Sequence, residues 1–532
     1  MKGLYRMKKS ILKPTFISIL VFQIAYILFI NFTRSENLID FDSGAALRHA
    51  IEIWRNGTLF LKNYSPVSTL EIDCTSFWAA PIFLATGSLG LSYAVIHAVL
   101  LVFILCLSNA VLKISGVGAD LRSATLCLLL VPYSFGQLEY FNMLFISAGQ
   151  YNFKIITLLY ITYFYLADIK KIKRPILLLN LSAFAFFLSV TTLSSGVYVL
   201  FMLIAPFMLA EVIQCINKQS ISLKSFRNFF LIGTVMLTAV LIKFRSMHFT
   251  PNQVNGSLLC EAGRFADNVL DCLTGIYILM GGIPKHGEVR VATVDGILHI
   301  TRFIFLTAMI CITFRTLKRE NSWFKSRFNT ACISILLCNL LVLIISSTTY
   351  GGSVFEYRYH ITWMILFIFL SVNCLEKFLS QLKNIWFKNL LLFALPAFIL
   401  CNSAVNFRYI SHLKPIEKDG ATQIAEYADA QNVSTVLMYK VPDTNSIPQI
   451  INAIRPDMEC FSLNDNWDGV QFFDYYCLDF DEVISREHIL LICKSDFNKL
   501  TDGIRGQYTY QTEIYGVSCY LKYQQHQPRP AF

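Results

Sequence analysis

Long apolar stretches recur along most of this chain, and each is about as long as a lipid bilayer is thick. A helix needs roughly 17 to 25 apolar residues to cross a hydrocarbon core of about 30 Å. Hydrophobic residues make up 55% of the 532 positions and charged residues only 15%, which lies outside the usual range of soluble globular domains. The sequence therefore predicts an α-helical polytopic membrane protein.

About eleven stretches fit a membrane span by length. The first, residues 15–32, follows five basic residues and lacks a small-residue cleavage site, so we interpret it as a retained helix and not as a removed signal peptide. The other expected helices cover residues 89–112, 123–136, 152–168, 175–193, 196–216, 228–244, 296–316, 328–349, 359–376 and 388–404.

Lysine and arginine gather in alternate, short connections between these spans. The basic connections are 113–122, 170–174, 218–227, 318–327 and 377–388. Because cytoplasmic loops carry the excess of basic residues, this pattern indicates a cytoplasmic N-terminus, and the net charge of +10 needs no nucleic-acid partner. The extracytoplasmic segments are then a large first outer loop of about 33–88, a second loop near 137–151, and segments 245–295 and 346–357.

The chain changes character after residue 404. Residues 1–404 form the expected membrane domain, whereas in residues 405–532 the strand-like runs 435–439, 488–493 and 519–523 alternate with the helix-like segments 422–430, 447–454 and 496–504. This predicts a small extracytoplasmic α/β domain, in which cysteines can form disulfides. The cysteines concerned are Cys460, Cys477, Cys493 and Cys519, together with Cys260 and Cys272 in the loop before the eighth helix.

Two acidic residues, Asp40 and Asp42, follow the first span and open an amphipathic helix that ends at Asn56-Gly57. Its apolar stripe contains Ala46, His49, Ala50 and Ile53. Asp42 or Ser43 is placed to cap this surface helix, because such side chains accept the unpaired N–H groups of the first turn. Alternatively, Asp42 is a general base held just above the bilayer.

This layout resembles the GT-C superfamily of membrane glycosyltransferases that use lipid-linked sugars, in particular the branch with protein O-mannosyltransferases and the aminoarabinose transferase of lipid A. The features shared are a first helix from the cytoplasm, a large acidic first outer loop, about eleven spans and a soluble outer domain. The acidic motif of the family is matched as Asp40-Phe-Asp42 and not as an adjacent Asp-Glu pair. The resemblance implies a polyprenyl-phosphate sugar as donor, with Asp42 or Asp40 as the base.

The resemblance also implies cations near the outer boundary to hold the donor phosphate. Lys154, Arg302 and Arg358 are placed there, although snorkelling of the charged group to the interface is the alternative explanation for each. Arg358 stands in a short glycine-started turn with Glu356 and His360, a suitable place for a sugar-phosphate clamp. The second outer loop, with Glu139 and Tyr151, is rich in aromatic and amide groups suited to sugars, or simply to the interface.

The leading hypothesis is a bacterial plasma-membrane glycosyltransferase that moves a sugar from a polyprenyl-phosphate donor to an outer-surface glycan, lipid or protein. There are two alternatives: a flippase or transporter of a lipid-linked sugar, and a surface-polysaccharide polymerase or ligase. No electron-transfer cofactor is implied, and a divalent cation at the acidic pair is an open alternative, since carboxylate oxygens suit such ions. No Walker-type loop or zinc motif supports ATP-driven or zinc-dependent chemistry.

Overall fold

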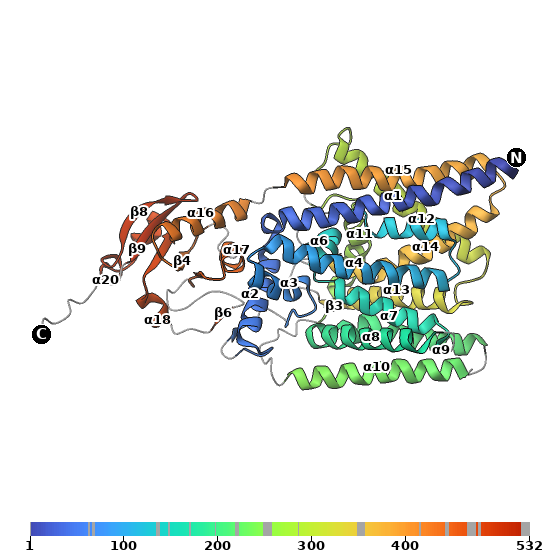
Figure 1. Cartoon of the computed structure of the whole chain (residues 1–532), viewed down its shortest axis with the longest axis horizontal. Coiled ribbons are helices and arrows are strands. Elements are labelled where there is room, and N and C mark those ends of the chain that lie inside the picture. Colours follow the sequence, from blue (N-terminus) through green and yellow to red (C-terminus); the bar gives the residue numbers. More distant parts are fainter. Residues whose placement is uncertain are drawn as a thin grey trace, which may run out of the picture.

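The protein is an elongated helical bundle with a smaller domain at one end (Figure 1). The computed structural model describes residues 2–522 except 62–63, 66–69, 135–138, 147–148, 170–171, 197, 219–222, 248–257, 286, 348–356, 414–415, 442–445, 465–474 and 477–479. The N-terminus lies at the end of the bundle farthest from the smaller domain. We call the end beside the smaller domain the domain end and the other the N-terminal end.

Eight helices among the described residues are long and apolar enough to cross a membrane, which confirms the expected class of fold. They lie in α1 (Lys2–Arg34), α4 (Leu89–Ile114), α8 (Arg174–Ser195), η3 (Val199–Ile204) continued by α9 (Ala205–Lys218), α12 (Val294–Arg319), α13 (Arg327–Ile345), η5 (Tyr357–His360) continued by α14 (Ile361–Gln381), and α15 (Ile385–His412).

Helices occupy the three other expected positions but do not meet the same criterion. They are α5 (Ala119–Leu129), with 11 residues, α7 (Asn152–Leu166), with 15 residues, and α10 (Leu223–Met247), whose described apolar part is Arg227–Leu241. Nearly all of α7 is buried, so neighbouring helices surround it and its apolar character reflects packing against protein. Length and composition thus support eight spans, and the count of eleven stays a prediction.

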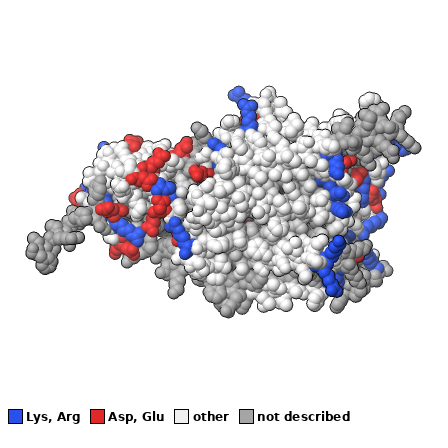
Figure 2. All heavy atoms as spheres, in the orientation of Figure 1, with Lys and Arg blue, Asp and Glu red and all other residues white. Residues whose placement is uncertain are grey.

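Charge separates to the two ends of the molecule (Figure 2). On the face shown, a broad region without charged side chains covers the bundle, and lysine and arginine gather at its N-terminal end. Acidic and basic side chains are mixed over the smaller domain. An uncharged band between two charged ends is the surface that a membrane-spanning bundle presents to lipid.

The smaller domain contains the expected mixture of helices and strands. Its five-stranded sheet has the order β5-β4-β7-β9-β8, with β4 (Thr435–Tyr439) parallel to β5 (Glu459–Ser462) and β7 (His488–Ile492), and with β9 (Val517–Lys522) antiparallel to β7 and β8 (Thr509–Ile514). Its helices are α16 (Ile416–Ala430), α17 (Ser446–Ile454), α18 (Phe480–Ser485), α19 (Lys494–Phe497) and α20 (Asp502–Arg505).

Two sequence expectations for this part of the chain need correction. The last helix of the bundle, α15, runs to His412, beyond the expected boundary at 404. Cys460, Cys493 and Cys519 are free thiols, as are Cys260 and Cys272, so none of these five forms the disulfide considered from the sequence. Burial of Cys460 and Cys519 in the sheet makes them small apolar residues of the core. Cys477 lies outside the described residues.

The segment between α1 and α4 connects the bundle to the smaller domain. It contains η1 (Glu36–Leu38), α2 (Phe41–Asn56), β1 (Tyr64–Ser65) and α3 (Thr75–Thr86). Helix α2 packs closely on α17, since a Cβ atom added at Gly44 would lie 3.0 Å from the carbonyl oxygen of Gln449. Strand β1 pairs with β6 (Tyr475–Tyr476), which adds a second connection. The smaller domain is therefore held against the helix that carries Asp42.

Candidate functional site

The first turn of α2 is organised by Asp40 and not by Asp42. Asp40 Oδ1 accepts the backbone N–H of Ser43 at 2.9 Å, and Ser43 Oγ accepts the backbone N–H of Asp40 at 2.9 Å. The expectation that Asp42 or Ser43 is the N-cap is thus wrong, because Asp40 is the cap and the helix begins at Phe41, which places Asp42 inside the first turn and Ser43 at its third position. Gly57, at a φ of 65°, ends the helix as expected, and the predicted apolar stripe is buried.

Asp42 is therefore available for another contact, which it makes with Arg358. Arg358 Nη1 lies 3.6 Å from Asp42 Oδ2, and the two side chains are 20% and 26% exposed. The guanidinium group also lies 5.5 Å from the ring centroid of Tyr359. η5, at the start of the α14 span, brings Arg358 to α2, so a carboxylate and a cation chosen separately from the sequence are in contact.

Asp40 is half-buried near the same turn. Its Oδ2 accepts a long hydrogen bond of 3.4 Å from Asn142 Nδ2 in α6 (Tyr140–Phe145). Burial raises the pKa of the Asp40 carboxyl above its ordinary value, although its hydrogen bonds with Ser43 and Asn142 act in the opposite direction. Asp40 thus caps the helix and has a raised pKa, whereas Asp42 contacts the guanidinium group of Arg358.

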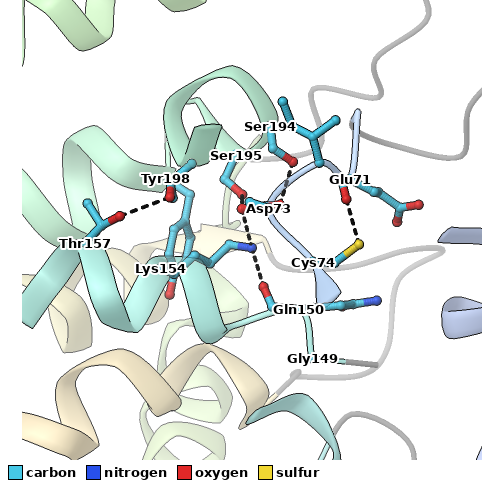
Figure 3. Close-up of polar contacts among 12 residues, drawn as sticks. Glu71, Asp73, Cys74, Gly149, Gln150, Lys154, Thr157, Ser194, Ser195 and Tyr198 are labelled. Carbon is cyan, nitrogen blue, oxygen red and sulfur yellow. Dashed lines mark hydrogen bonds and ion pairs between the residues drawn. The ribbon is translucent and has the colours of Figure 1, made fainter. Parts of the chain in front are cut away.

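Lys154 lies in a second, more deeply buried ion pair at the domain end (Figure 3). Its Nζ is 2.9 Å from Asp73 Oδ2 and donates to the carbonyl oxygen of Gln150 at 2.8 Å. Ser194 Oγ donates to Asp73 Oδ1 at 2.6 Å, and Ser195 Oγ donates to Asp73 Oδ2 at 2.7 Å. The Lys154 side chain is 11% exposed and bonded at its head, so it does not snorkel to the surface.

Sequence reasoning selected Lys154 but missed Asp73, which pairs with it, and the two serines that hold Asp73. Asp73 precedes α3, and Ser194 and Ser195 end α8, so the residues are distant in the chain and meet only in the fold. Two signals could have pointed to them: a carboxylate directly before an apolar helix, and two adjacent hydroxyls at the end of a span.

A row of tyrosines connects the two ion pairs. The Tyr151 ring centroid lies 5.1 Å from Lys154 Nζ and 6.2 Å from the ring centroid of Tyr198. The Tyr198 ring lies 6.4 Å from that of Tyr359, next to Arg358. A chain of contacts therefore runs at the domain end from Lys154 through Tyr151, Tyr198 and Tyr359 to Arg358 and Asp42, and we call these residues the tyrosine site.

Arg302 and Glu139 lie in a different group. Arg302 Nε donates to Asn402 Oδ1 at 2.6 Å, and its buried Nη2 has no hydrogen-bond partner among the described residues. Burial raises the pKa of Glu139, while Lys285, Ser134 and Arg302 act to lower it. Within the described part of the chain, no contact joins Arg302 to Lys154 or Arg358, so the three expected cations do not form one cluster.

The remaining expected residues have the following positions. His360 is fully buried, and its Nδ1 accepts the indole N–H of Trp363 at 2.9 Å. Glu356 lies outside the described residues. Among the residues that the structure describes, no group of three or more His, Cys, Asp or Glu side chains could hold a metal ion. A divalent cation at Asp40 and Asp42 therefore stays a prediction.

Comparison with known proteins identifies the fold. No protein-family model matches the chain, and no curated protein matches it in sequence. The crystal structure of ArnT from Cupriavidus metallidurans in the apo state matches with a TM-score of 0.58 at 10% identity, covering 96% of this chain and 98% of ArnT. The structure of the same ArnT bound to undecaprenyl phosphate matches with a TM-score of 0.58 at 11% identity, covering 95% and 97%. The expected resemblance to the aminoarabinose transferase of the GT-C superfamily is thus confirmed at the level of fold.

Proposed function

We propose that this protein is a membrane glycosyltransferase that moves a sugar from a polyprenyl-phosphate donor to a glycan, lipid or protein at the outer face of a bacterial plasma membrane. The observation that carries the proposal is the tyrosine site, which places two cations, a carboxylate and a row of aromatic rings at one end of an ArnT-like fold. In the proposed orientation the N-terminal end is cytoplasmic and the domain end is extracytoplasmic, in agreement with the basic residues of the N-terminal end.

A polyprenyl-phosphate donor suits this end of the bundle. The related ArnT is known in a complex with undecaprenyl phosphate. In the present chain the phosphate would be bound by Lys154 and Arg358, since hydrogen bonds between a cation and a phosphate are about twice as strong as neutral ones. The prenyl chain would lie along the apolar surface of the bundle, and the rings of Tyr151 and Tyr198 would border the sugar.

The transfer would be a single displacement. Asp42 accepts the proton of an acceptor hydroxyl, the acceptor oxygen forms the new bond to the anomeric carbon, and the bond from that carbon to the phosphate oxygen breaks. The electron pair of that bond leaves with the phosphate, whose charge Lys154 stabilises. Because attack and departure occur on opposite faces, the configuration at the anomeric carbon inverts.

The contact between Asp42 and Arg358 gives the two cations different roles. Arg358 touches the base, whereas Lys154 lies at the far end of the tyrosine row. In-line displacement needs the leaving group opposite the base. Lys154, which is farther from Asp42 along the tyrosine row, is therefore better placed than Arg358 to stabilise the leaving phosphate. A donor phosphate that draws Arg358 toward itself would also free the Asp42 carboxylate to accept a proton.

A flippase for a lipid-linked sugar is the second candidate, and one observation favours it. The span that ends at Lys218 begins with a π-helical stretch, η3, beside Tyr198. Irregular helices near a binding site are common in transporters as well as at other functional sites. A flippase would bind the same donor at the same cations but would not need Asp42 as a base.

Binding of undecaprenyl phosphate to the full-length protein in nanodiscs, measured by native mass spectrometry, tests the donor assignment. We expect Lys154→Met to weaken binding about 10- to 100-fold, which corresponds to the roughly 1.5–3 kcal/mol of a hydrogen bond to a charged group. Lys377→Met is the matched control, because Lys377 also forms an ion pair of 2.9 Å, with Glu320, away from the tyrosine site.

A double variant separates binding from folding. Lys154→Met alone leaves the buried Asp73 carboxylate without its cation, which costs stability. Asp73→Asn combined with Lys154→Met removes both charges, so it should restore folding but not donor binding. Full donor affinity in this double variant would refute the role given to Lys154.

A further inference from the structure

A polar cleft of about 670 Å³ lies between the C-terminal half of α2 and the smaller domain, beside the contact of α2 with α17. One wall is formed by Arg48, Glu52 and Arg55 on α2. The other wall is formed where the parallel strands β4, β5 and β7 begin, by their first residues and by the turns that precede them. These are Asn432, Val433, Ser434, Thr435, Pro456, Asp457, Glu459, Arg486 and Glu487. The cleft is separate from the tyrosine site, which is lined by other residues.

The charges of the cleft nearly balance and are mostly held in pairs. The lining contains three arginines and four acidic residues. Arg48 lies 3.1 Å from Glu52, Arg486 is paired with Glu459, and Arg455, beside the cleft, is paired with Asp457. Arg55 donates to the carbonyl oxygen of Pro456 at 2.9 Å, so it bridges the two walls.

One group in this lining still has an unused donor. Arg48 is 11% exposed at its side chain, and its buried Nη1 has no hydrogen-bond partner among the described residues, while its Nη2 contacts Glu52. A buried guanidinium N–H without a partner costs free energy, which a rotation of the Arg48 side chain that brings Nη1 to an oxygen acceptor in the cleft would recover. The carboxylates of the lining, in turn, retain lone pairs that can accept further donors.

These properties select the chemistry of the occupant. A compact ion would have to displace existing ion pairs. An apolar molecule would remove water from the charged side chains without replacing its hydrogen bonds. A carbohydrate brings many hydroxyls, each of which donates one hydrogen bond and accepts others, and so matches walls that hold both fixed donors and fixed acceptors. The cleft therefore fits a neutral, hydroxyl-rich chain.

We infer that this cleft binds the glycan part of the acceptor, an inference that rests on the proposed transferase function. Asp42 and Arg48 lie on the same helix, about 9 Å apart along its axis at 1.5 Å per residue. The two positions differ by about a third of a turn around the axis. A glycan seated in the cleft would bend around α2 to present its end to Asp42, and the smaller domain would select the acceptor.

A glycan array tests this assignment. Full-length protein in labelled nanodiscs is applied to an array of bacterial surface glycans and, in parallel, to a peptide array. We expect the wild type to bind a subset of the glycans. Binding should fall at least tenfold in Arg48→Gln, which removes the unused donor, and in Ser434→Trp, which fills the cleft from an exposed position.

Matched controls on the same domain are Lys499→Gln, whose side chain is 74% exposed, and Asn498→Trp, at an exposed position outside the cleft lining. Both should bind glycans as the wild type does. Absence of glycan binding, binding to peptides instead, or equal glycan binding by Ser434→Trp would overturn the inference. Undecaprenyl phosphate binding is measured on the same preparations. If glycan binding is absent but the donor still binds, only the assignment of the cleft fails; if the donor does not bind either, the proposed function fails too.

Discussion

Among the described residues of the bundle, one buried ion pair lies at the domain end and another at the N-terminal end, and they differ in what surrounds them. Glu211 in α9 is fully buried, and its Oε1 lies 2.8 Å from Arg327 Nη2. Asp73 and Lys154 are similarly close, at 2.9 Å, and nearly as buried. Both pairs carry the desolvation cost of charges removed from water, which only good geometry and further hydrogen bonds offset.

The pair at the N-terminal end is hydrogen-bonded to side chains of a neighbouring helix. Asn228 Nδ2 donates to Glu211 Oε2 at 3.2 Å, and Arg327 also donates to Ser225 Oγ at 3.1 Å, so the network joins α9, α10 and α13. The pair at the domain end continues through Tyr151 toward the tyrosine site. The first pair therefore connects three helices of the bundle, whereas in the proposed function the second pair also positions the cation that binds the donor phosphate.

The largest effect is expected at the domain end for Asp42→Asn. Loss of a general base lowers the rate about 10²- to 10⁴-fold. Asp42 is partly exposed, so stability should change by less than about 1 kcal/mol. Mass spectrometry of envelope fractions at matched membrane levels should show loss of a sugar-sized modification and accumulation of the donor. Unchanged modification would favour the flippase.

Glu211→Gln should have the largest effect on stability. It leaves Arg327 buried without its carboxylate, which costs about 3–5 kcal/mol. Thermal unfolding in nanodiscs measures the loss, and undecaprenyl phosphate binding by the folded fraction should equal that of the wild type. A folded Glu211→Gln protein that fails to bind the donor would remove the distinction between the two pairs.

Asp73→Asn should be milder than Glu211→Gln. The amide oxygen can still accept a hydrogen bond from Ser194 or Ser195, so the loss of stability should be about 1–3 kcal/mol. Because Lys154 then loses the carboxylate that positions it, donor binding should weaken as well. Donor affinity at the wild-type level, measured beside the unfolding curve, would show that Lys154 needs no positioning partner.

Asp40→Asn is expected to have the smallest effect. Asparagine caps helices as well as aspartate does, so stability at pH 7 should change by less than about 1 kcal/mol. The raised pKa fixes the sign of the pH dependence. The folded protein binds this proton more tightly, so wild-type stability falls as pH rises from the ordinary value of 3.8 through the raised folded value.

The asparagine variant lacks this contribution, so its stability relative to the wild type should increase with pH over that interval. Unfolding curves of the two proteins at matched pH values measure the difference. Loss of activity in Asp40→Asn, together with full activity in Asp42→Asn, would reverse the assignment of the base.

Local patterns were readable from the sequence, whereas contacts between distant segments were not. The end of α2 at Gly57 and the strand Thr435–Tyr439 follow from turn chemistry and apolar runs, and both were predicted. The capping role of Asp40 was missed because Asp40, Asp42 and Ser43 are all competent caps. The partners of Lys154 come from two other segments, which only the packing of α7 and α8 around Asp73 brings together.

The central claim is that the domain end, and not the N-terminal end, binds the lipid phosphate. Photocrosslinking of the full-length protein with a diazirine-bearing undecaprenyl phosphate, followed by peptide mass spectrometry, tests it directly. We predict labelling of peptides that contain Lys154, Ser194–Tyr198 or Arg358, with competition by unlabelled undecaprenyl phosphate. Competed labelling confined to peptides around Glu211 and Arg327, or no competed labelling at all, would contradict the account.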